Sequence, residues 1–209
     1  NPKPAPEVVT AHVVGIRQAR EKARLEQQTK QREQDKRAQA KYGKDVDKQY
    51  ADAKASGPPE GYFLLLQAEK FSAEGGGKVT VEKKRGASGD AFRNWDNKGH
   101  WLEYTFELPK DGTYQIAFKY ARGQAGAGVR SLQLDGATPC EAARAMEMPN
   151  TGGWETWKMY SLQWPEFPVA KPFLLPLKAG KHILRIENVS GGGVNLDYII
   201  VAAPFLAVT

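Results

Sequence analysis

Two short stretches of the chain carry residue types that could bind a small ligand. In Thr151–Trp157, two tryptophans lie three residues apart beside a Gly-Gly pair. In Gly193–Val201, Asn195 and Asp197 interrupt an alternating run of apolar residues. An indole packs well on the C–H face of a sugar ring, and short polar side chains bond the ring's hydroxyls. These residue types favour sugar binding over catalysis.

The tryptophans differ in their sequence surroundings. Trp101 and Trp157 lie in alternating, strand-like patterns, which predict a packing role. Trp154 follows two glycines and fits either an exposed platform or loop packing. Trp95 has polar residues on both sides, so we expect it to lie exposed on a loop.

Residues for an enzymatic reaction are not assembled in this sequence. His12, His100 and His182 are scattered, and no HExxH, GxSxG or CxxC motif occurs. The glycine runs are not followed by Lys-Ser/Thr, so they are not phosphate loops. The single cysteine, Cys140, is expected to be a partly buried structural thiol. We therefore expect a binding protein that is not an enzyme.

The N-terminal quarter is predicted to be a helical arm. From about Glu7 to Ala55 it has no proline and is rich in Ala, Gln, Lys, Arg and Glu. Residues 1–56 hold 13 Lys+Arg and 8 Asp+Glu, a balance of +5 within the total of +6. The breaker Ser56–Gly61 predicts an arm over 1–56, a linker over 57–61 and a domain over 62–209.

The arm has two interpretations that the sequence leaves open. Large apolar residues nearly vanish between Leu25 and Tyr42, which fits a solvated helical spacer with ion pairs along it. Its more apolar beginning, residues 7–25, could instead dock on a protein partner. Acidic residues interleave with the basic ones throughout, so nucleic acid is not an expected partner.

From Tyr62 the apolar residues alternate with period two and turn signals recur at short intervals. Many short strands with glycine-rich turns predict a β-sandwich. The expected strands are Tyr62–Phe71, Lys78–Glu82, His100–Leu108, Thr113–Ala121, Ser131–Leu134, Trp157–Ser161, Phe173–Leu177, Lys181–Asn188 and Val194–Ala202.

Seven pieces of residues 63–203 occur in the order typical of one family. They are Leu66–Glu69, Gly99–Tyr104, Asp111–Tyr114 leading to Tyr120-Ala121, Leu132–Gly136, Thr151–Trp157, Leu177–His182 and Asn195–Ile199. The chain thus resembles the carbohydrate-binding modules of families 6 and 35, sugar-binding domains usually attached to polysaccharide-degrading enzymes. The resemblance implies a mainly β, jelly-roll-like sandwich, preceded here by a long charged α-helical arm.

The resemblance also implies a sugar site in the loops at one end of the sandwich. Carried over to this sequence, Trp95 and Trp154 would face each other as aromatic platforms and Asn195 would be the polar anchor. The ligand would be a polysaccharide or glycan.

A structural calcium ion (Ca2+) is a further implication of the resemblance. Its ligands would be Gln67, Glu69 and Asp197, on first and last strands that lie side by side. Calcium prefers six to eight oxygen donors, and Gln67 supplies one without charge. A strand-edge network without metal is the alternative, since no dense carboxylate cluster is present.

Residues 161–176 depart from the family pattern. We expect this connection to be longer than usual, and it carries four prolines with Trp164 and Phe167. It could wall the sugar cleft, fill it, or dock a protein partner. The alternative function is therefore a structural subunit of a larger extracytoplasmic assembly, with the arm and this loop making the protein contacts.

The place of action follows from the family rather than from a targeting signal. The start, Asn1–Pro6, lacks the apolar core of a signal peptide, and no apolar run approaches the length of a transmembrane segment. We expect an exported, bacterial-like protein that is periplasmic, cell-surface or secreted.

Overall fold

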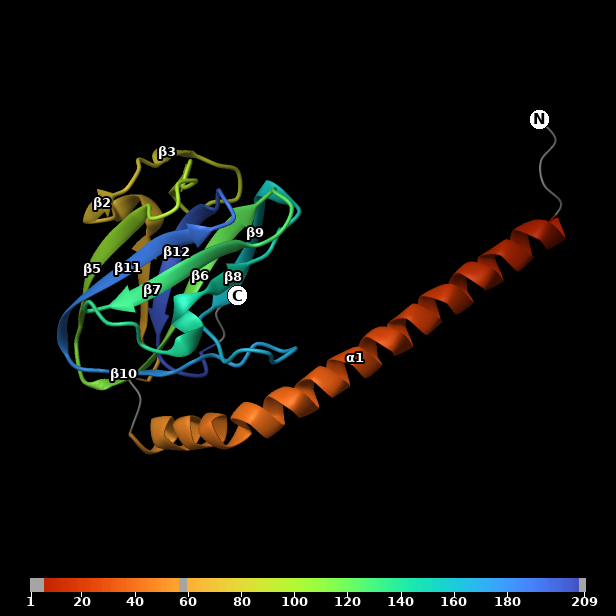
Figure 1. Cartoon of the computed structure of the whole chain (residues 1–209), viewed down its shortest axis with the longest axis horizontal. Coiled ribbons are helices and arrows are strands. Elements are labelled where there is room, and N and C mark those ends of the chain that lie inside the picture. Colours follow the sequence, from red (N-terminus) through yellow and green to blue (C-terminus); the bar gives the residue numbers. More distant parts are fainter. Residues whose placement is uncertain (1–5, 57–59, 207–209) are drawn as a thin grey trace. The chain divides into compact units, whose positions relative to one another are not determined.

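The computed structural model describes residues 6–56 and 60–206. It contains one long helix and a set of β-strands (Figure 1). By its contacts the chain divides into two compact units. The first unit is the chain up to Lys44 together with Pro165–Val169, and the second is Asp45–Trp164 with Ala170 onward.

One long helix, α1 (Pro6–Ala55), forms the arm, as predicted. Its composition explains it, because strong helix formers fill the stretch and proline is absent between Glu7 and Ala55. Within the first unit, Glu166 receives bonds from three helix side chains: Gln34 Nε2 on its carbonyl (2.9 Å), and Lys41 Nζ (2.5 Å) and Tyr42 Oη (3.2 Å) on its carboxylate. None of the described helices is apolar enough over a sufficient length to cross a membrane.

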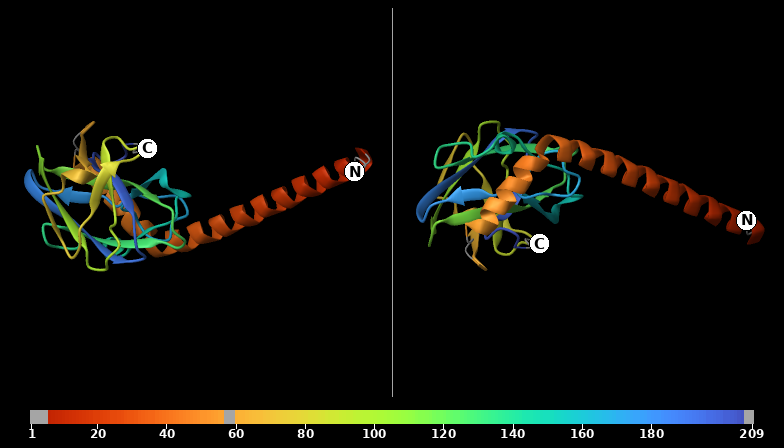
Figure 2. Two further views of the ribbon diagram at one scale, coloured as in Figure 1. Left: turned by 90° about the horizontal axis from the view of Figure 1, so that it is seen from above. Right: turned by 90° about the horizontal axis from the view of Figure 1, so that it is seen from below.

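The second unit is a β-sandwich of two antiparallel sheets, which Figure 2 shows from two further directions. The larger sheet runs β10-β6-β12-β4-β3, with β1 also paired to β12 and β9 to β6. Its strands are β1 (Phe63–Gln67), β3 (Thr80–Lys83), β4 (Asp90–Arg93), β6 (Gly112–Arg122), β9 (Gly153–Ser161), β10 (Leu175–Leu177) and β12 (Asn195–Ala202).

The smaller sheet runs β2-β5-β11-β7-β8. Its strands are β2 (Ala73–Gly75), β5 (Trp101–Leu108), β7 (Gly128–Leu134), β8 (Met146–Met148) and β11 (Gly180–Ser190). Two short 3-10 helices, η1 (Ala68–Lys70) and η2 (Glu141–Arg144), complete the unit. Each of the nine expected strands has a counterpart, but the first ends at Gln67, and η1 takes the place of its predicted continuation to Phe71. The three strands that the sequence did not predict, β2, β4 and β8, are three or four residues long.

The core lies between the two sheets. In β5 the expected alternation holds, with Leu102, Tyr104 and Phe106 buried. In β6 both faces are buried, because Ala117 on its outer face packs with Ile200 and Ala202. Gln115, also buried there, donates to the carbonyls of Ala203 and Leu206.

The last turns of α1 belong to the sandwich unit. Val46 and Ala53 are buried. Gln49 Oε1 accepts bonds from Trp164 Nε1 and from the Leu174 amide, each at 3.0 Å. The boundary between the two compact units lies near residue 44, within the helix. Residues 57–59 of the predicted linker lie outside the described part of the chain, so the predicted linker stays a prediction.

Candidate functional site

A pocket of about 380 Å³ lies where β4 ends and where β9 and β12 begin. These ends meet because β12 pairs with β4 through Leu196 and Phe92, and because β6 pairs with both β12 and β9. The lining residues come from these ends and the neighbouring loops: Lys84, Arg93, Asn94, Asp96, Trp154, Gly193 and Asn195.

Trp154 is the aromatic side chain of the pocket. It is 43% exposed, although it is a large apolar residue. Gly123 makes room for its ring, because a Cβ at this position would lie 2.8 Å from Trp154 Cδ1. Gly193 lies at the other edge of the ring, where a Cβ would make an ordinary contact of 3.5 Å with Trp154 Cη2. The local sequence therefore places the Trp154 indole at the surface with part of its ring accessible to a ligand.

Asn195 holds the segment that carries Trp154. It is buried, and its Nδ2 donates to the Trp154 backbone carbonyl at 2.7 Å. The structure thus brings two of the three predicted sugar-binding residues to one pocket. Asn195 positions the tryptophan as well as lining the pocket.

The pocket rim carries charges that the sequence reasoning did not assign to a site. Glu82 on β3 bonds both Lys84 Nζ (2.7 Å) and Arg93 Nε (2.9 Å). Hydrogen bonds from Lys84 and Arg93 lower the pKa of the Glu82 carboxyl, so it stays ionised and holds both cations in place. Asp96 adds a carboxylate to the lining.

Two buried arginines hold the loop that ends at Gly193. Arg122 donates to the carbonyls of Gly191 and Gly193. Arg130 donates to the Gly192 carbonyl at 2.8 Å and to Asn188 Oδ1 at 2.8 Å. Burial lowers the pKa of Arg130 to about 9, so it still carries its charge at neutral pH. The pocket therefore has a rigid edge on this side.

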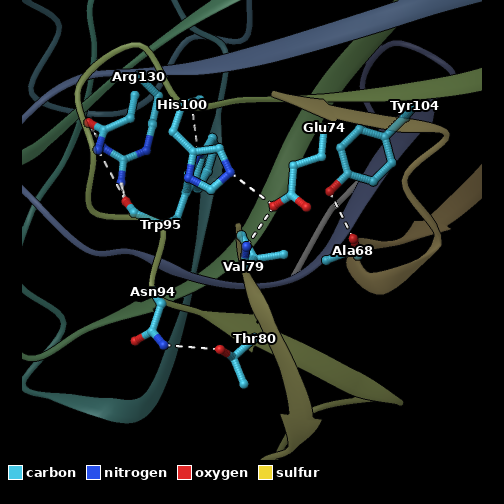
Figure 3. Close-up of polar contacts among 10 residues, drawn as sticks. Ala68, Glu74, Val79, Thr80, Asn94, Trp95, His100, Tyr104 and Arg130 are labelled. Atoms are coloured by element: carbon cyan, nitrogen blue, oxygen red, sulfur yellow. Dashed lines mark hydrogen bonds and ion pairs between the residues drawn. The ribbon is translucent and has the colours of Figure 1, made fainter. Parts of the chain in front are cut away.

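Trp95 is not an exposed platform, and that expectation is wrong. Its side chain is fully buried. Figure 3 shows it with Arg130 and His100; the indole Nε1 donates to the His100 carbonyl at 2.9 Å, and the Arg130 guanidinium lies 4.3 Å from the ring centroid. Phe92 packs edge-on against the ring at 5.6 Å. Trp95 therefore cannot face Trp154 across a cleft.

The residues that flank Trp95 reach the pocket in its place. Arg93, Asn94 and Asp96 are exposed and line it. Asn94 adopts a φ of 65°, a left-handed conformation that asparagine tolerates, and its Nδ2 bonds Thr80 Oγ1 at 3.0 Å. The polar residues beside Trp95 were the signal for these pocket residues.

The predicted calcium ligands lie beside the β1–β12 pair, which confirms that the first and last strands are neighbours. Ser88 Oγ is 3.3 Å from Gln67 Oε1 and 3.1 Å from Asp197 Oδ1, so these two side chains share one network. Glu69, on η1, has a buried Oε2 without a hydrogen-bond partner in the described residues.

A lysine already neutralises Asp197. Lys119 Nζ lies 2.8 Å from Asp197 Oδ2, and the Asp197 side chain is fully buried. A divalent cation on this carboxylate would lie within a few ångströms of the ammonium and would be repelled by it. As arranged, Asp197 does not fit a calcium ion.

Residues 161–176 line no part of the pocket beside Trp154. Trp164 instead packs on Phe173 with ring centroids 4.8 Å apart, and Tyr50 Oη donates to the Pro172 carbonyl at 2.9 Å. The loop therefore neither walls nor fills this pocket.

Comparison with known proteins identifies the family of the chain. The model of the carbohydrate binding module, family 6, matches residues 67–203. The chain belongs to this family. Trp154, Asn195, Lys119 and Asp197 all lie within the matched range.

Relatives and solved structures agree with this assignment. The module is 32% identical over 101 residues to the clotting factor G alpha subunit of Tachypleus tridentatus, covering 48% of this chain and 14% of that protein. It is 27% identical over 153 residues to an exo-beta-D-glucosaminidase of Amycolatopsis orientalis, covering 72% and 13%. The chain thus spans about one seventh of the length of these relatives.

The fold is shared with isolated modules. A family 35 module from Clostridium thermocellum superposes with a TM-score of 0.55 at 21% identity, covering 70% of this chain and 99% of that one. The C-terminal family 6 module of a laminarinase from Zobellia galactanivorans gives 0.53 at 24%, covering 68% and 99%.

Proposed function

We propose that this chain is a non-catalytic module that binds a polysaccharide or glycan in the pocket beside Trp154. The observation that carries the proposal is the exposed indole, 43% accessible, on the wall of a pocket with polar groups around it. Pockets of this size suit small ligands or the end of a chain.

The chemistry of the lining supports a saccharide. The Trp154 indole offers an apolar face for the C–H side of a pyranose. Arg93, Asn94 and Asp96 offer donors and acceptors for its hydroxyls. One aromatic wall and a polar rim replace the pair of facing tryptophans that the sequence predicted.

The same lining supports binding over hydrolysis. Most glycoside hydrolases place two carboxyl groups on either side of the scissile bond. Among the described lining residues, Asp96 supplies the sole carboxyl group. We therefore assign the pocket a binding role.

The family membership supports a polysaccharide as ligand and an exported place of action. Two relatives are named as an exo-beta-D-glucosaminidase and a beta-agarase, from Amycolatopsis orientalis and Microbulbifer thermotolerans. We infer that the module acts on the periplasmic, cell-surface or secreted side, where polysaccharides are met.

A second candidate function is protein docking through α1, within an extracytoplasmic assembly. The observation that favours it is the exposure of Val13, Val14, Ile16 and Leu25, which are 40% to 51% accessible. The remaining part of the predicted docking segment, residues 7–12, lies outside the described side chains. The two functions are compatible, because the pocket belongs to the other unit.

Trp154→Ala tests the binding proposal. Pull-down on insoluble chitosan, agarose and β-1,3-glucan should show retention of the unchanged chain on at least one of them and loss in the variant. The melting temperature should stay nearly unchanged, because the indole is half exposed. Ile183→Ala, which removes a 40% exposed side chain on β11, is the matched control and should bind normally.

Gly123→Ala tests the seat of the indole without removing it. The new Cβ would meet Trp154 Cδ1 at 2.8 Å and displace the ring, so retention should fall. Adding Gly123→Ala to Trp154→Ala should not lower retention on the polysaccharide any further. Retention of every variant on the polysaccharide that holds the unchanged chain would refute the pocket.

A further inference from the structure

Lys119 makes contacts typical of a bound cation. It lies on β6, and its side chain is only 19% exposed. Its Nζ is 2.8 Å from Asp197 Oδ2 and 2.7 Å from the Gly86 carbonyl oxygen. The rings of Tyr198 and Trp157 lie 5.2 and 5.5 Å away, so two π-faces also surround the ammonium.

These contacts tie together parts of the chain that are distant in sequence. Gly86 belongs to the connection between β3 and β4, Lys119 to β6 and Asp197 to β12. Ser88, in the same connection, donates its backbone amide to Asp197 Oδ1 at 3.0 Å. Trp157 Nε1, from β9, donates to the Arg85 carbonyl at 2.8 Å. The ammonium therefore joins the β3–β4 connection to β6 and β12 of the larger sheet.

The charges in this network cancel without any added ion. Asp197 is fully buried, and a buried carboxylate is stable only when it is paired and hydrogen-bonded. Lys119 supplies the single positive charge that it needs. Gln67, a predicted ligand that shares Ser88 with Asp197, is neutral, so it adds no charge for a divalent ion to balance.

We propose that the Lys119 ammonium replaces the calcium ion that the family resemblance implies for this chain. The amine braces the β3–β4 connection against β6 and β12 through Asp197, the Gly86 carbonyl and the two aromatic rings. The sandwich then folds and keeps its pocket without a metal. Glu69, the other predicted ligand, has a buried Oε2 that makes no hydrogen bond with this network or with any other described residue.

The first experiment melts the full chain after EDTA treatment and again in excess calcium chloride. The same melting temperature in both is expected. A melting temperature that falls in EDTA and recovers with calcium would overturn the proposal, because a resident metal would then be bracing the sheet.

The second experiment removes the ammonium. Lys119→Met keeps the aliphatic stem and leaves Asp197 buried without its cation, which should lower the melting temperature by roughly 6–20 °C. Lys158→Ala, an exposed lysine on β9, is the control and should melt like the unchanged chain. An unchanged melt for Lys119→Met would contradict the proposal.

A double variant keeps the test decisive if Lys119→Met fails to fold. Adding Asp197→Asn to Lys119→Met removes the unpaired buried charge along with its partner. The double variant should therefore be more stable than Lys119→Met alone. A double variant that is no more stable than Lys119→Met would show that the two groups do not act as a pair, and would sink the proposal.

Discussion

At the scale of single residues, His182 is held as a double donor. Its Nδ1 is 2.7 Å from Asp135 Oδ2, and its Nε2 is 2.9 Å from the Lys178 carbonyl oxygen. Both neighbours are acceptors, so the protonated imidazolium satisfies both contacts. Burial opposes this charge, but the hydrogen bonds to Lys178 and Asp135 outweigh it and raise the pKa of His182 above 6.5.

This raised pKa predicts a pH-dependent stability. The folded state holds the proton more tightly than the unfolded state, so the contribution is full below pH 6.5 and is lost as pH rises through the folded pKa. Melting curves from pH 6 to pH 9 should show the unchanged chain losing its advantage over His182→Gln. Asp135→Asn, which keeps a side chain suited to the positive φ of 53°, should shrink the same advantage. Parallel pH curves for the unchanged chain and His182→Gln would refute the assignment.

Single residues also show where sequence reasoning stops. Asn195 reaches the pocket because it starts β12, a placement that the predicted strand Val194–Ala202 includes. Trp154 reaches it because β9 begins at Gly153, four residues before the predicted start at Trp157. Trp95 is buried in the core although its neighbours are exposed, because its ring packs on the Arg130 guanidinium and its Nε1 donates to the His100 carbonyl. Arg130 also donates to the Trp95 backbone carbonyl from 35 positions away in the sequence, and the residues next to Trp95 give no sign of such a contact.

At the scale of elements, α1 serves two units. Its polar composition correctly predicts a long helix, yet composition hides the change of role near Lys44. Up to there, its described side chains are mostly exposed; beyond there, Gln49 and Tyr50 bond the residues after β9. The breaker at Ser56–Gly61 correctly predicts where the helix ends, but it does not reveal that the last turns of α1, before the breaker, already pack in the sandwich unit.

Two truncations separate these roles. A chain starting at residue 45 should melt close to the full chain. A chain starting at residue 57 should melt several degrees lower, because it loses buried Val46 and Ala53 and leaves the buried Leu174 amide without Gln49. An unsatisfied buried donor costs about 1–3 kcal/mol, so Gln49→Ala alone should destabilise by that order.

The control for this pair is Lys48→Ala, since Lys48 is 76% exposed and bonds only its helix neighbour Asp52 among the contacts described. It should leave the melting temperature unchanged. Equal melting temperatures for the two truncations would show that the last turns of α1 add nothing to the sandwich.

At the scale of the whole molecule, most of the net positive charge and the candidate saccharide pocket lie in different parts of the chain. Residues 57–209 hold 17 Lys+Arg and 16 Asp+Glu, a balance of +1, so most of the net charge of +6 lies on residues 1–56. The pocket residues all belong to the sandwich unit. A neutral saccharide should therefore be bound by the sandwich alone, whereas an electrostatic partner would act on the arm.

This separation is tested with the full chain and the chain starting at residue 45. The saccharide that passes the pull-down is titrated into each while the tryptophan fluorescence is followed, at low salt and again at high salt. The same Kd within about twofold is expected for both chains and both salts, a difference below ~0.5 kcal/mol. A tenfold weaker Kd for the shorter chain, about 1.4 kcal/mol, would mean that residues before Asp45 contribute directly to the saccharide site. A Kd that weakens with salt only in the full chain would instead assign the ligand an acidic group held by the basic arm.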